Sequence, residues 1–337
     1  MKIIKKMPSK IAKIVFMSQK FYKDITRKPP FFKISEDVHS STLGKYYFIM
    51  TEEQMLSGHS QQYHFDEKGI PIISSYIDVE DQKMIYYPIS IGQYGLAIWH
   101  TYLQTKSEKD KQRFLNIADW FCNNKIEDEK LGAYWLTHVD KPAYQIYEPW
   151  KSCFSQARAI NILLRASQIT GDKNYELLSE KALNPFLFSV KDGGIVTFLN
   201  EGPFYEEYPA KVPVLVLNGM IFALFGIYDF VRVNPNHNQA KEIYNRGLKC
   251  LEKLLPKFDI GFWSQYSLCK ADFHPKVDPA RISYHLLHIV QLQAMYKITG
   301  HEIFNHYANK WLSYLNLSNK LKMYVLKYKA LKKMNRL

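Results

Sequence analysis

From about residue 90 onward, apolar positions recur with the three-to-four-residue spacing of amphipathic helices. One fragment occurs twice: residues 164–172, LRASQITGD, resemble residues 292–301, LQAMYKITGH, and another amphipathic stretch follows each copy. In both copies the glycine stands where a helix commonly ends in a left-handed C-cap. The pattern therefore predicts a repeated unit of helix, glycine and helix.

Reading outward from this unit predicts four helical hairpins. They comprise residues 90–105 with 109–124, 152–170 with 174–190, 213–232 with 238–256, and 283–299 with 302–316. The turns within hairpins are short, whereas the connections between them, at 125–151, 191–212 and 257–282, are long and rich in aromatic and charged residues. In a ring of antiparallel helix pairs such connections emerge at one end, so we expect all three on a single face.

The region before the hairpins has a different pattern. Aromatic and β-branched residues cluster at 46–50, 62–65 and 70–73, and the last two runs flank the turn sequence at 66–69, which predicts short strands and a hairpin. The expected fold is mainly α: an incomplete (α/α) toroid of about four helical hairpins, preceded by a small β-rich region. The expected divisions are 1–33, a basic amphipathic segment; 34–87, β-rich; 88–317, the toroid; and 318–337, a basic tail.

Composition and charge narrow the class of protein. The chain has 337 residues, 47% of them hydrophobic, and four cysteines, which argues against a disordered chain and a disulfide scaffold. The net charge of +13 lies at the ends: residues 1–33 carry +9 and residues 318–337 carry +7, so residues 34–317 sum to −3. The sequence contains no nucleic-acid-binding motif, and we do not expect the chain to bind nucleic acid.

The two basic ends have an amphipathic pattern. In the first, Ser9 is placed to cap a helix with Ile11, Ile14 and Phe21 near one face, and the run from Lys320 to Arg336 is similar. Both fit a helix lying on an anionic membrane surface and, equally, a solvated helix docked on the body or on a partner subunit. The working hypothesis is peripheral membrane association of a homodimer.

Targeting signals are weak in this sequence. The cysteines lack zinc-like spacing, no signal-peptide core follows the basic N-terminus, and the uncharged segment 212–228 is broken by Pro213 and Gly219. We therefore expect reduced cysteines, a buried helix at 212–228 and a cytoplasmic protein, peripheral to the inner membrane surface.

The three long connections hold the candidate chemistry. Aromatic residues there are interspersed with few carboxylates and cations, a pattern that suits stacking on sugar rings, although the same aromatics could simply pack the loops. Glu206 and Glu207 are adjacent in an extended segment and should point to opposite sides, so at most one faces a ligand. No nucleotide-binding, serine-hydrolase or metal-binding motif occurs, and we expect no cofactor and no metal.

Several motifs together resemble the glucuronyl C5-epimerase family, which acts on heparosan-type glycans. The resemblance covers about residues 87–317 and is carried, in order, by YPISIGQYGL at 87–96, QARAI at 156–160, YEEYP at 205–209, LNG at 217–219, LFGIYD at 224–229, and Ala280, Arg281, Tyr284, His285, His288, Ile289 and 291–293. It implies a β-rich N-terminal part, an incomplete α/α toroid, and conversion of D-glucuronate to L-iduronate within the polymer.

The resemblance also implies site residues. The catalytic set by motif match is Glu207, Tyr208, Tyr266 and Tyr284. The chain departs from the family at Cys269, where members carry arginine, and at Ile282 and Ser283, where they carry Trp-Asp. The expected substrate-binding set joins the nearest basic residues to neighbouring aromatic and polar ones: Lys211, Arg158, Arg281, Tyr147, Trp150, Tyr205, His285, Gln93 and Tyr94.

The implied reaction removes the C5 proton and returns one from the opposite face, which needs two acid/base groups and a cation beside the carboxylate. Three alternatives stay open. A polysaccharide lyase would share the first step. An α/α-barrel glycosidase would need two carboxylates about 6.5–9.5 Å apart for inversion, with Glu148, Glu207 and Asp278 as candidates. A membrane-associated glycan-binding protein would bind the polymer without reaction.

Overall fold

The computed structural model describes residues 22, 32–58, 63–75, 79, 83–147 and 149–334. Within this part the chain is mainly helical and carries three small antiparallel sheets. The helices are α2 (Glu52–Gly58), α3 (Pro88–Thr105), α4 (Glu108–Asn123), α5 (Cys153–Thr170), α6 (Lys173–Lys181), α7 (Leu217–Val233), α8 (Asn238–Leu254), α9 (Ile282–Thr299), α10 (Glu302–Ser313) and α11 (Leu317–Lys333).

The repeated unit is confirmed in its local geometry. Gly171 and Gly300 end α5 and α9 with positive φ values of 78° and 69°, which glycine adopts without steric cost. The turn after α3 uses a polar N-cap instead, because the Ser107 hydroxyl accepts a hydrogen bond from the Asp110 amide at the start of α4. Such caps fix each hairpin over a few residues.

Two predicted helix boundaries were wrong. α6 ends at Lys181 and not near residue 190, because Pro185 follows in a short 3₁₀ turn, Asn184–Leu187. α7 begins at Leu217 and not at 213, because Pro213 and the left-handed Leu215 (φ 55°) prevent the preceding segment from being helical. The remaining helix bounds lie within three residues of those predicted.

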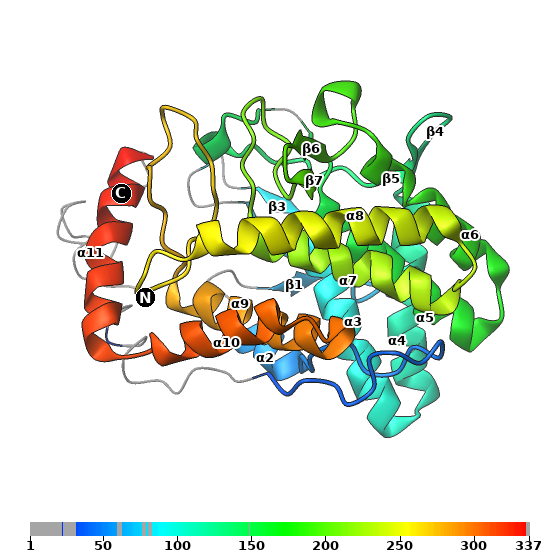
Figure 1. Ribbon diagram of the computed structural model, residues 1–337. Coiled ribbons are helices and arrows are strands. Elements are labelled where there is room, and N and C mark those ends of the chain that lie inside the picture. Colours follow the sequence, from blue (N-terminus) through cyan, green and yellow to red (C-terminus); the bar gives the residue numbers. More distant parts are fainter. Residues whose placement is uncertain are drawn as a thin grey trace, which may run out of the picture.

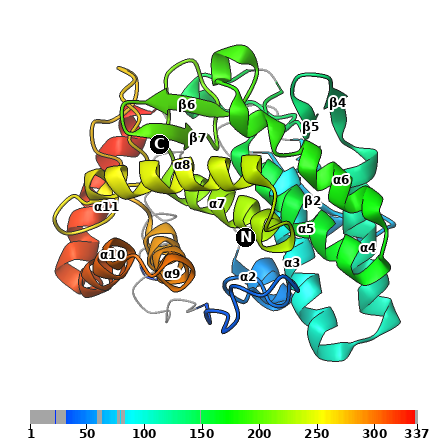
Figure 2. The same ribbon diagram turned by 45° about the vertical axis from the view of Figure 1, so that its right-hand side comes forward.

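The four hairpins follow one another along an open arc (Figures 1 and 2). α3 packs on α5, α5 on α7, and α7 on α9, while each also contacts its hairpin partner, α4, α6, α8 or α10. Glycines allow the closest approach: a Cβ on Gly226 of α7 would lie 2.5 Å from the Ala157 Cα of α5. The arrangement is the expected incomplete toroid, with α3, α5, α7 and α9 as its inner helices.

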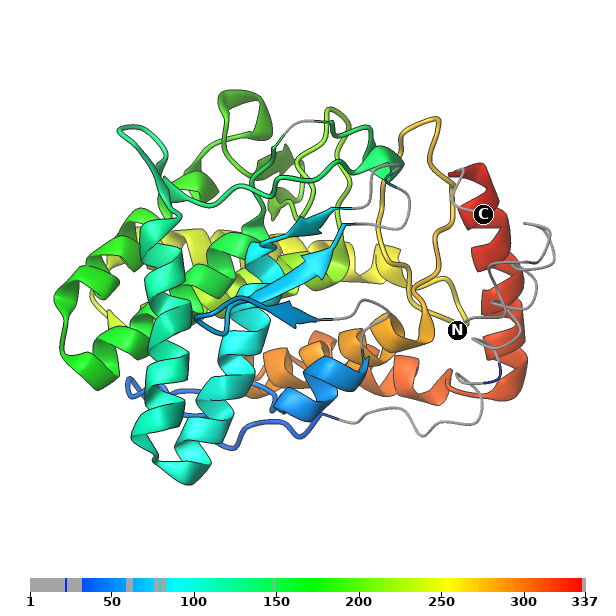
Figure 3. The ribbon, with the colours of Figure 1, turned by 180° about the vertical axis from the view of Figure 1, so that it is seen from behind.

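The strands are short and form three small sheets. β1 (His64–Phe65) pairs with β2 (Pro71–Ser74), which pairs with β3 (Met84–Ile85), and this sheet lies beside α3 (Figure 3). The predicted hairpin around residues 66–69 is confirmed, with Gly69 at φ 76°. The run at 46–50 forms no strand: Phe48 makes one isolated bridge to Ile34. β4 (Ile126–Asp128) pairs with β5 (Gly132–Tyr134), and β6 (Val196–Leu199) with β7 (Gly202–Tyr205).

The segment 32–58 fastens the C-terminal ends of the inner helices. Its backbone or side chains bond to His100 of α3, Gln168 of α5, Asp229 of α7 and Lys297 of α9. The contact to Asp229 is fully buried: this carboxylate accepts hydrogen bonds from Tyr47, Asn161, Arg165 and Arg232. One end of the toroid is thereby closed, which leaves the other end for a site.

The C-terminal basic run forms a helix, α11, that packs on the body of the molecule. Its Met323 packs in a small core with Trp263, Ile282 and Leu286. The predicted N-terminal amphipathic helix lies outside the described residues, apart from Tyr22. In the part of the chain that the structure describes, no helix has both the length and the apolarity needed to cross a membrane. Cys153, Cys250 and Cys269 are buried free thiols, and Cys122 is a half-buried one.

Candidate functional site

The three long connections meet at the N-terminal ends of the inner helices, as predicted (Figure 1). The Cys153 amide, at the start of α5, donates to the Glu206 carbonyl at 3.0 Å. The Leu217 amide, at the start of α7, donates to the Tyr266 carbonyl at 3.1 Å, and Ser267 forms a bridge with Val216. These main-chain bonds join the second connection to the start of α5 and the third connection to the start of α7.

The β6–β7 hairpin presents the two glutamates to opposite sides. Glu206 turns toward the protein: its Oε1 accepts from the Thr197 hydroxyl at 2.7 Å and its Oε2 from the Leu215 amide at 3.0 Å. Glu207 turns toward α7, where its Oε2 accepts from Asn218 Nδ2 at 3.3 Å. The predicted divergence of the pair is confirmed, and Glu206 acts as a clamp on the left-handed Leu215.

Glu207 lies in a tight recess. A Cβ on Gly219 would approach its Oε2 to 2.6 Å, so the carboxylate rests directly on the first turn of α7. Burial raises the pKa of both Glu206 and Glu207 to about 7, opposed at Glu207 by the Tyr208 hydroxyl, Lys141 and Asn218. Glu207 is therefore poised to exchange a proton near neutral pH.

Aromatic rings from the first connection pack against Tyr208. Its ring centroid lies 4.9 Å from that of Tyr144 and 5.3 Å from that of Trp150. The Lys141 ammonium lies 5.4 Å from the same centroid, although only 4% of this lysine is exposed. Tyr144 also stacks on His274, at 5.8 Å. The first connection thus supplies both a wall and a buried cation beside Glu207.

Tyr266 and Tyr284 complete the group from the third connection and the first turn of α9. Their ring centroids are 5.0 Å apart, edge to face. Burial raises the pKa of Tyr266 well above 10, and the charge on Glu207 raises it further. Tyr208 also hydrogen-bonds to Tyr266. The structure therefore brings Glu207, Tyr208, Tyr266 and Tyr284 into one continuous cluster.

The expected substrate-binding residues divide by exposure. Lys211 and Tyr147 are exposed, Arg281 and Gln93 are half-buried, and Trp150 forms part of the wall beside Tyr208. Four others are buried with partners of their own: Arg158 bonds to the Tyr46 hydroxyl, Tyr205 to the Ile243 carbonyl, Tyr94 to Glu52, and His285 to Ser264 and the Trp311 carbonyl.

In this structure the side chains of these four residues are engaged by other groups of the protein. Arg158, Tyr205 and His285 have at most 1% of their surface exposed, which leaves no atom for a ligand in this conformation. Tyr94 reaches the Glu52–Arg113 ion pair beside α2 and not the Glu207 cluster. Burial lowers the pKa of His285 to about 3, so this ring is a neutral hydrogen-bonding element of the core.

Two lysines near the cluster were missed by sequence reasoning. Lys141 is the only lysine in the aromatic-rich run 134–150, and this pattern is only a weak indication of a functional cation. Lys327 is one of six lysines in α11, and no pattern distinguishes it from the others. Its ammonium pairs with Asp278 Oδ1 at 2.5 Å and lies 5.8 Å from the Tyr266 ring centroid.

Two further observations concern metal binding and the glycosidase alternative. Among the described residues no three His, Cys, Asp or Glu side chains converge as metal ligands would. Of the glycosidase carboxylates, Asp278 is committed to Lys327, and Glu148 lies outside the described residues.

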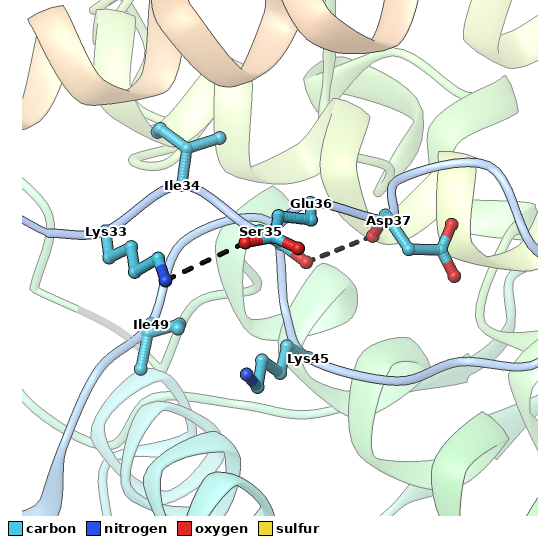
Figure 4. A pocket seen from close by; sticks show the side chains of 7 residues that line it. All are labelled: Lys33, Ile34, Ser35, Glu36, Asp37, Lys45 and Ile49. Atoms are coloured by element: carbon cyan, nitrogen blue, oxygen red, sulfur yellow. Dashed lines mark hydrogen bonds and ion pairs between the residues drawn. The ribbon is translucent and has the colours of Figure 1, made fainter.

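A separate hollow of about 220 Å³ lies in the N-terminal segment (Figure 4). It is lined by Lys33, Ile34, Ser35, Glu36, Asp37, Lys45 and Ile49, and it shares no residue with the Glu207 cluster. Its charges are mixed, and Lys33 already pairs with Glu36 at 3.8 Å. We therefore place the functional site at Glu207.

Comparison with known proteins gives one family and several relatives. The D-glucuronyl C5-epimerase of Caenorhabditis elegans is 27% identical over 241 residues, which cover 67% of this chain and 38% of that protein. An uncharacterized protein of Methanocaldococcus jannaschii is 29% identical over 243 residues, covering 66% and 76% of the two chains. The chain thus spans well under half the length of the worm epimerase that it matches.

A solved structure shows a weaker likeness. The family 76 glycoside hydrolase (mannosidase) of Bacteroides thetaiotaomicron superposes with a TM-score of 0.42 at 12% identity, covering 71% of this chain and 60% of that one. The family described as the D-glucuronyl C5-epimerase C-terminus matches residues 128–313, more than half of the chain, and this range contains the whole Glu207 cluster. The chain belongs to the D-glucuronyl C5-epimerase C-terminal family.

Proposed function

We propose that this chain is a polysaccharide uronate C5-epimerase that converts D-glucuronate to L-iduronate residues in a heparosan-like glycan. The observation that carries the proposal is the cluster of Glu207, Tyr208, Tyr266 and Tyr284 at the open end of the toroid, in the segment that matches the family. It supplies several proton-transfer groups within one aromatic-walled site.

The C5 hydrogen of a uronate is acidic because the carbanion left behind delocalises into the adjacent carboxylate. One enzyme group takes this proton, and a second returns a proton to C5 from the opposite face of the ring. The buried ammonium of Lys141, beside Glu207 and Tyr208, is suited to stabilise the charge that develops on the carboxylate.

The protonation states suggest which groups serve which role. Tyr266, whose pKa is well above 10, holds its proton and can donate it to the carbanion. Glu207, with a pKa of about 7, is partly ionised at neutral pH and can accept a proton, directly or through the Tyr208 hydroxyl. Neutral tyrosines and a half-ionised carboxyl therefore form an acid and a base in one site.

The decisive experiment follows the C5 proton by NMR in deuterated water. Heparosan, its N-sulfated form and the chondroitin backbone are each incubated with the full chain, and the glucuronate C5 signal is followed over time. The proposal predicts loss of that signal for at least one heparosan-type polymer, with iduronate signals appearing. An unsaturated, ultraviolet-absorbing product would identify a lyase instead, and polymer binding without exchange would identify a binding protein.

Glu207→Gln and Tyr284→Phe test the assignment of the groups. Each removes one proton-transfer group at nearly constant volume, so we expect C5 exchange to fall by at least about 100-fold while the chain stays folded. Tyr86→Phe is the control, because Tyr86 is 42% exposed and belongs to neither the catalytic nor the expected substrate-binding set. Exchange at the wild-type rate in either variant would remove that residue from the catalytic set.

A further inference from the structure

α11 has two faces of different character. The inner face is fixed to the body: Met323 and Ala330 are buried, and Lys327 pairs with the buried Asp278. The outer face exposes four large apolar side chains, with 46–57% of each accessible to solvent: Leu317, Leu321, Val325 and Tyr328. Contiguous exposed apolar side chains of this kind often mark a surface that contacts a partner or a membrane.

The four side chains form one continuous stripe. Their spacing of four, four and three residues places them along one side of the helix, over about 16 Å. The helix lies at the edge of the molecule, outside the arc of hairpins (Figure 1). Because the inner contacts hold the helix in place, the stripe cannot turn inward without breaking the Lys327–Asp278 pair.

The surroundings of the stripe are strongly basic. α11 contains six lysines and no acidic residue. Lys322, Lys329, Lys332 and Lys333 are exposed, and none of the four forms an ion pair within the described part of the chain. Lys322 reaches toward Phe262, with its ammonium 5.9 Å from the ring centroid. The outer face thus offers apolar side chains between cations.

We propose that the outer face of α11 docks on an anionic lipid surface. A bilayer with acidic headgroups matches both features, since apolar side chains enter the boundary of the acyl region and lysines meet lipid phosphates. A second copy meeting this face symmetrically would bring two sets of lysines together without an acidic partner. A uronate polymer would satisfy the lysines but leave the leucines and Val325 in water.

Vesicle sedimentation of the full chain tests the proposal. We expect binding to phosphatidylcholine vesicles that contain phosphatidylglycerol, weaker binding to phosphatidylcholine alone, and release as salt is raised. Leu321→Gln combined with Val325→Gln should lower the partition coefficient at least about tenfold, because both side chains lose their apolar contact with lipid. Leu177→Gln on α6 is the matched control, since Leu177 is 55% exposed elsewhere.

Three results would overturn the proposal. These are absence of wild-type binding to the acidic vesicles, wild-type binding strength in the double variant, and an equal loss in the Leu177 control. Light scattering after gel filtration can give a fourth result that overturns the proposal. If the wild type is a dimer and the double variant a monomer, with no change in vesicle binding, the face contacts a second copy of the chain.

A labelling measurement keeps the test decisive if the double variant folds poorly. Val325→Cys carrying a polarity-sensitive dye should shift its emission to the blue on acidic vesicles, and Leu177→Cys with the same dye should not. Absence of a shift at position 325 on vesicles that sediment with the protein would place the contact elsewhere. A shift produced equally by heparosan in the absence of lipid would assign the face to the glycan.

Discussion

At the scale of single residues, the two adjacent glutamates show how backbone direction separates roles. Glu206 is bound by Thr197 and the Leu215 amide and serves the backbone, whereas Glu207 meets Asn218, Tyr208 and Lys141. Burial raises the pKa of both to about 7. Burial therefore raises the pKa of both carboxyl groups, but the two have different roles. Glu206 holds the backbone on one side of the strand, whereas Glu207 can transfer a proton on the other.

Glu206→Gln should change how stability depends on pH. The pKa of Glu206 is about 7 in the folded chain and about 4.3 when unfolded, so its contribution is fully present below about pH 4 and is lost as the pH rises to about 7. The loss is on the order of 3 kcal/mol. A glutamine never ionises and can still bond to Thr197 and Leu215, so the variant should lose less stability between about pH 5 and 8.

Urea unfolding across this pH range measures the difference, with the exposed Glu53→Gln as control. In the wild type both buried glutamates contribute to the decline, and the variant should retain the part due to Glu207. A decline of unchanged steepness in Glu206→Gln would show that this carboxyl does not carry a raised pKa.

At the scale of elements, α11 extends the site beyond the segment that matches the family. The match ends at residue 313, yet Lys327 pairs with Asp278, whose carbonyl accepts a hydrogen bond from the Tyr266 amide at 2.8 Å. Gln265 and Pro279 form a bridge across the same loop. The basic C-terminal helix therefore takes part in holding a candidate catalytic tyrosine.

Lys327→Met should weaken both the fold and the reaction. It leaves Asp278 buried without a counter-charge, which costs about 3–5 kcal/mol of the free energy of unfolding. We expect a lower urea midpoint and slower C5 exchange, both partly restored by adding Asp278→Asn. Lys329→Met, on the exposed side of the same helix, is the control. Equal effects of the two single variants would contradict a specific role for the Lys327–Asp278 pair.

At the scale of the whole molecule, the toroid has a closed end and an open end. The segment 32–58 bonds to all four inner helices at their C-terminal ends, and the long connections gather at the N-terminal ends. The closed end is held by Asp229, which has no exposed surface and is surrounded by Arg165, Arg232 and Tyr47. The contacts that stabilise the scaffold therefore lie at the opposite end of the toroid from the Glu207 cluster.

Asp229→Asn should destabilise the whole toroid without touching the site. Removing the carboxylate leaves Arg165 and Arg232 buried without their counter-charge, for which we expect a loss of about 3–5 kcal/mol in the free energy of unfolding. Asp272→Asn, at an exposed position, is the control for denaturant unfolding. A variant that stays folded should keep C5 exchange near the wild-type rate. A selective loss of exchange at full stability would contradict a purely structural role.

Much of the fold could be predicted because its signals are local. Amphipathic periodicity and the cap glycines Gly171 and Gly300 specify four hairpins over short distances, and antiparallel pairing then dictates that the connections share one face. The helix ends that were missed, after α6 and before α7, depend on Pro185, Pro213 and the Glu206 contact with Leu215. The two prolines are visible in the sequence, whereas the contact between Glu206 and Leu215 exists only in the folded chain.

The sequence by itself determined the catalytic candidates, since YEEYP and the later tyrosines are recognisable as motifs and extended geometry separates Glu206 from Glu207. The tertiary structure decided which cations accompany them. Arg158, close to the motifs in sequence, is buried against Tyr46, whereas Lys141 and Lys327 approach the tyrosines from segments about 190 residues apart. Charge acts through space and not along the chain, so only the packing of distant elements could place these lysines.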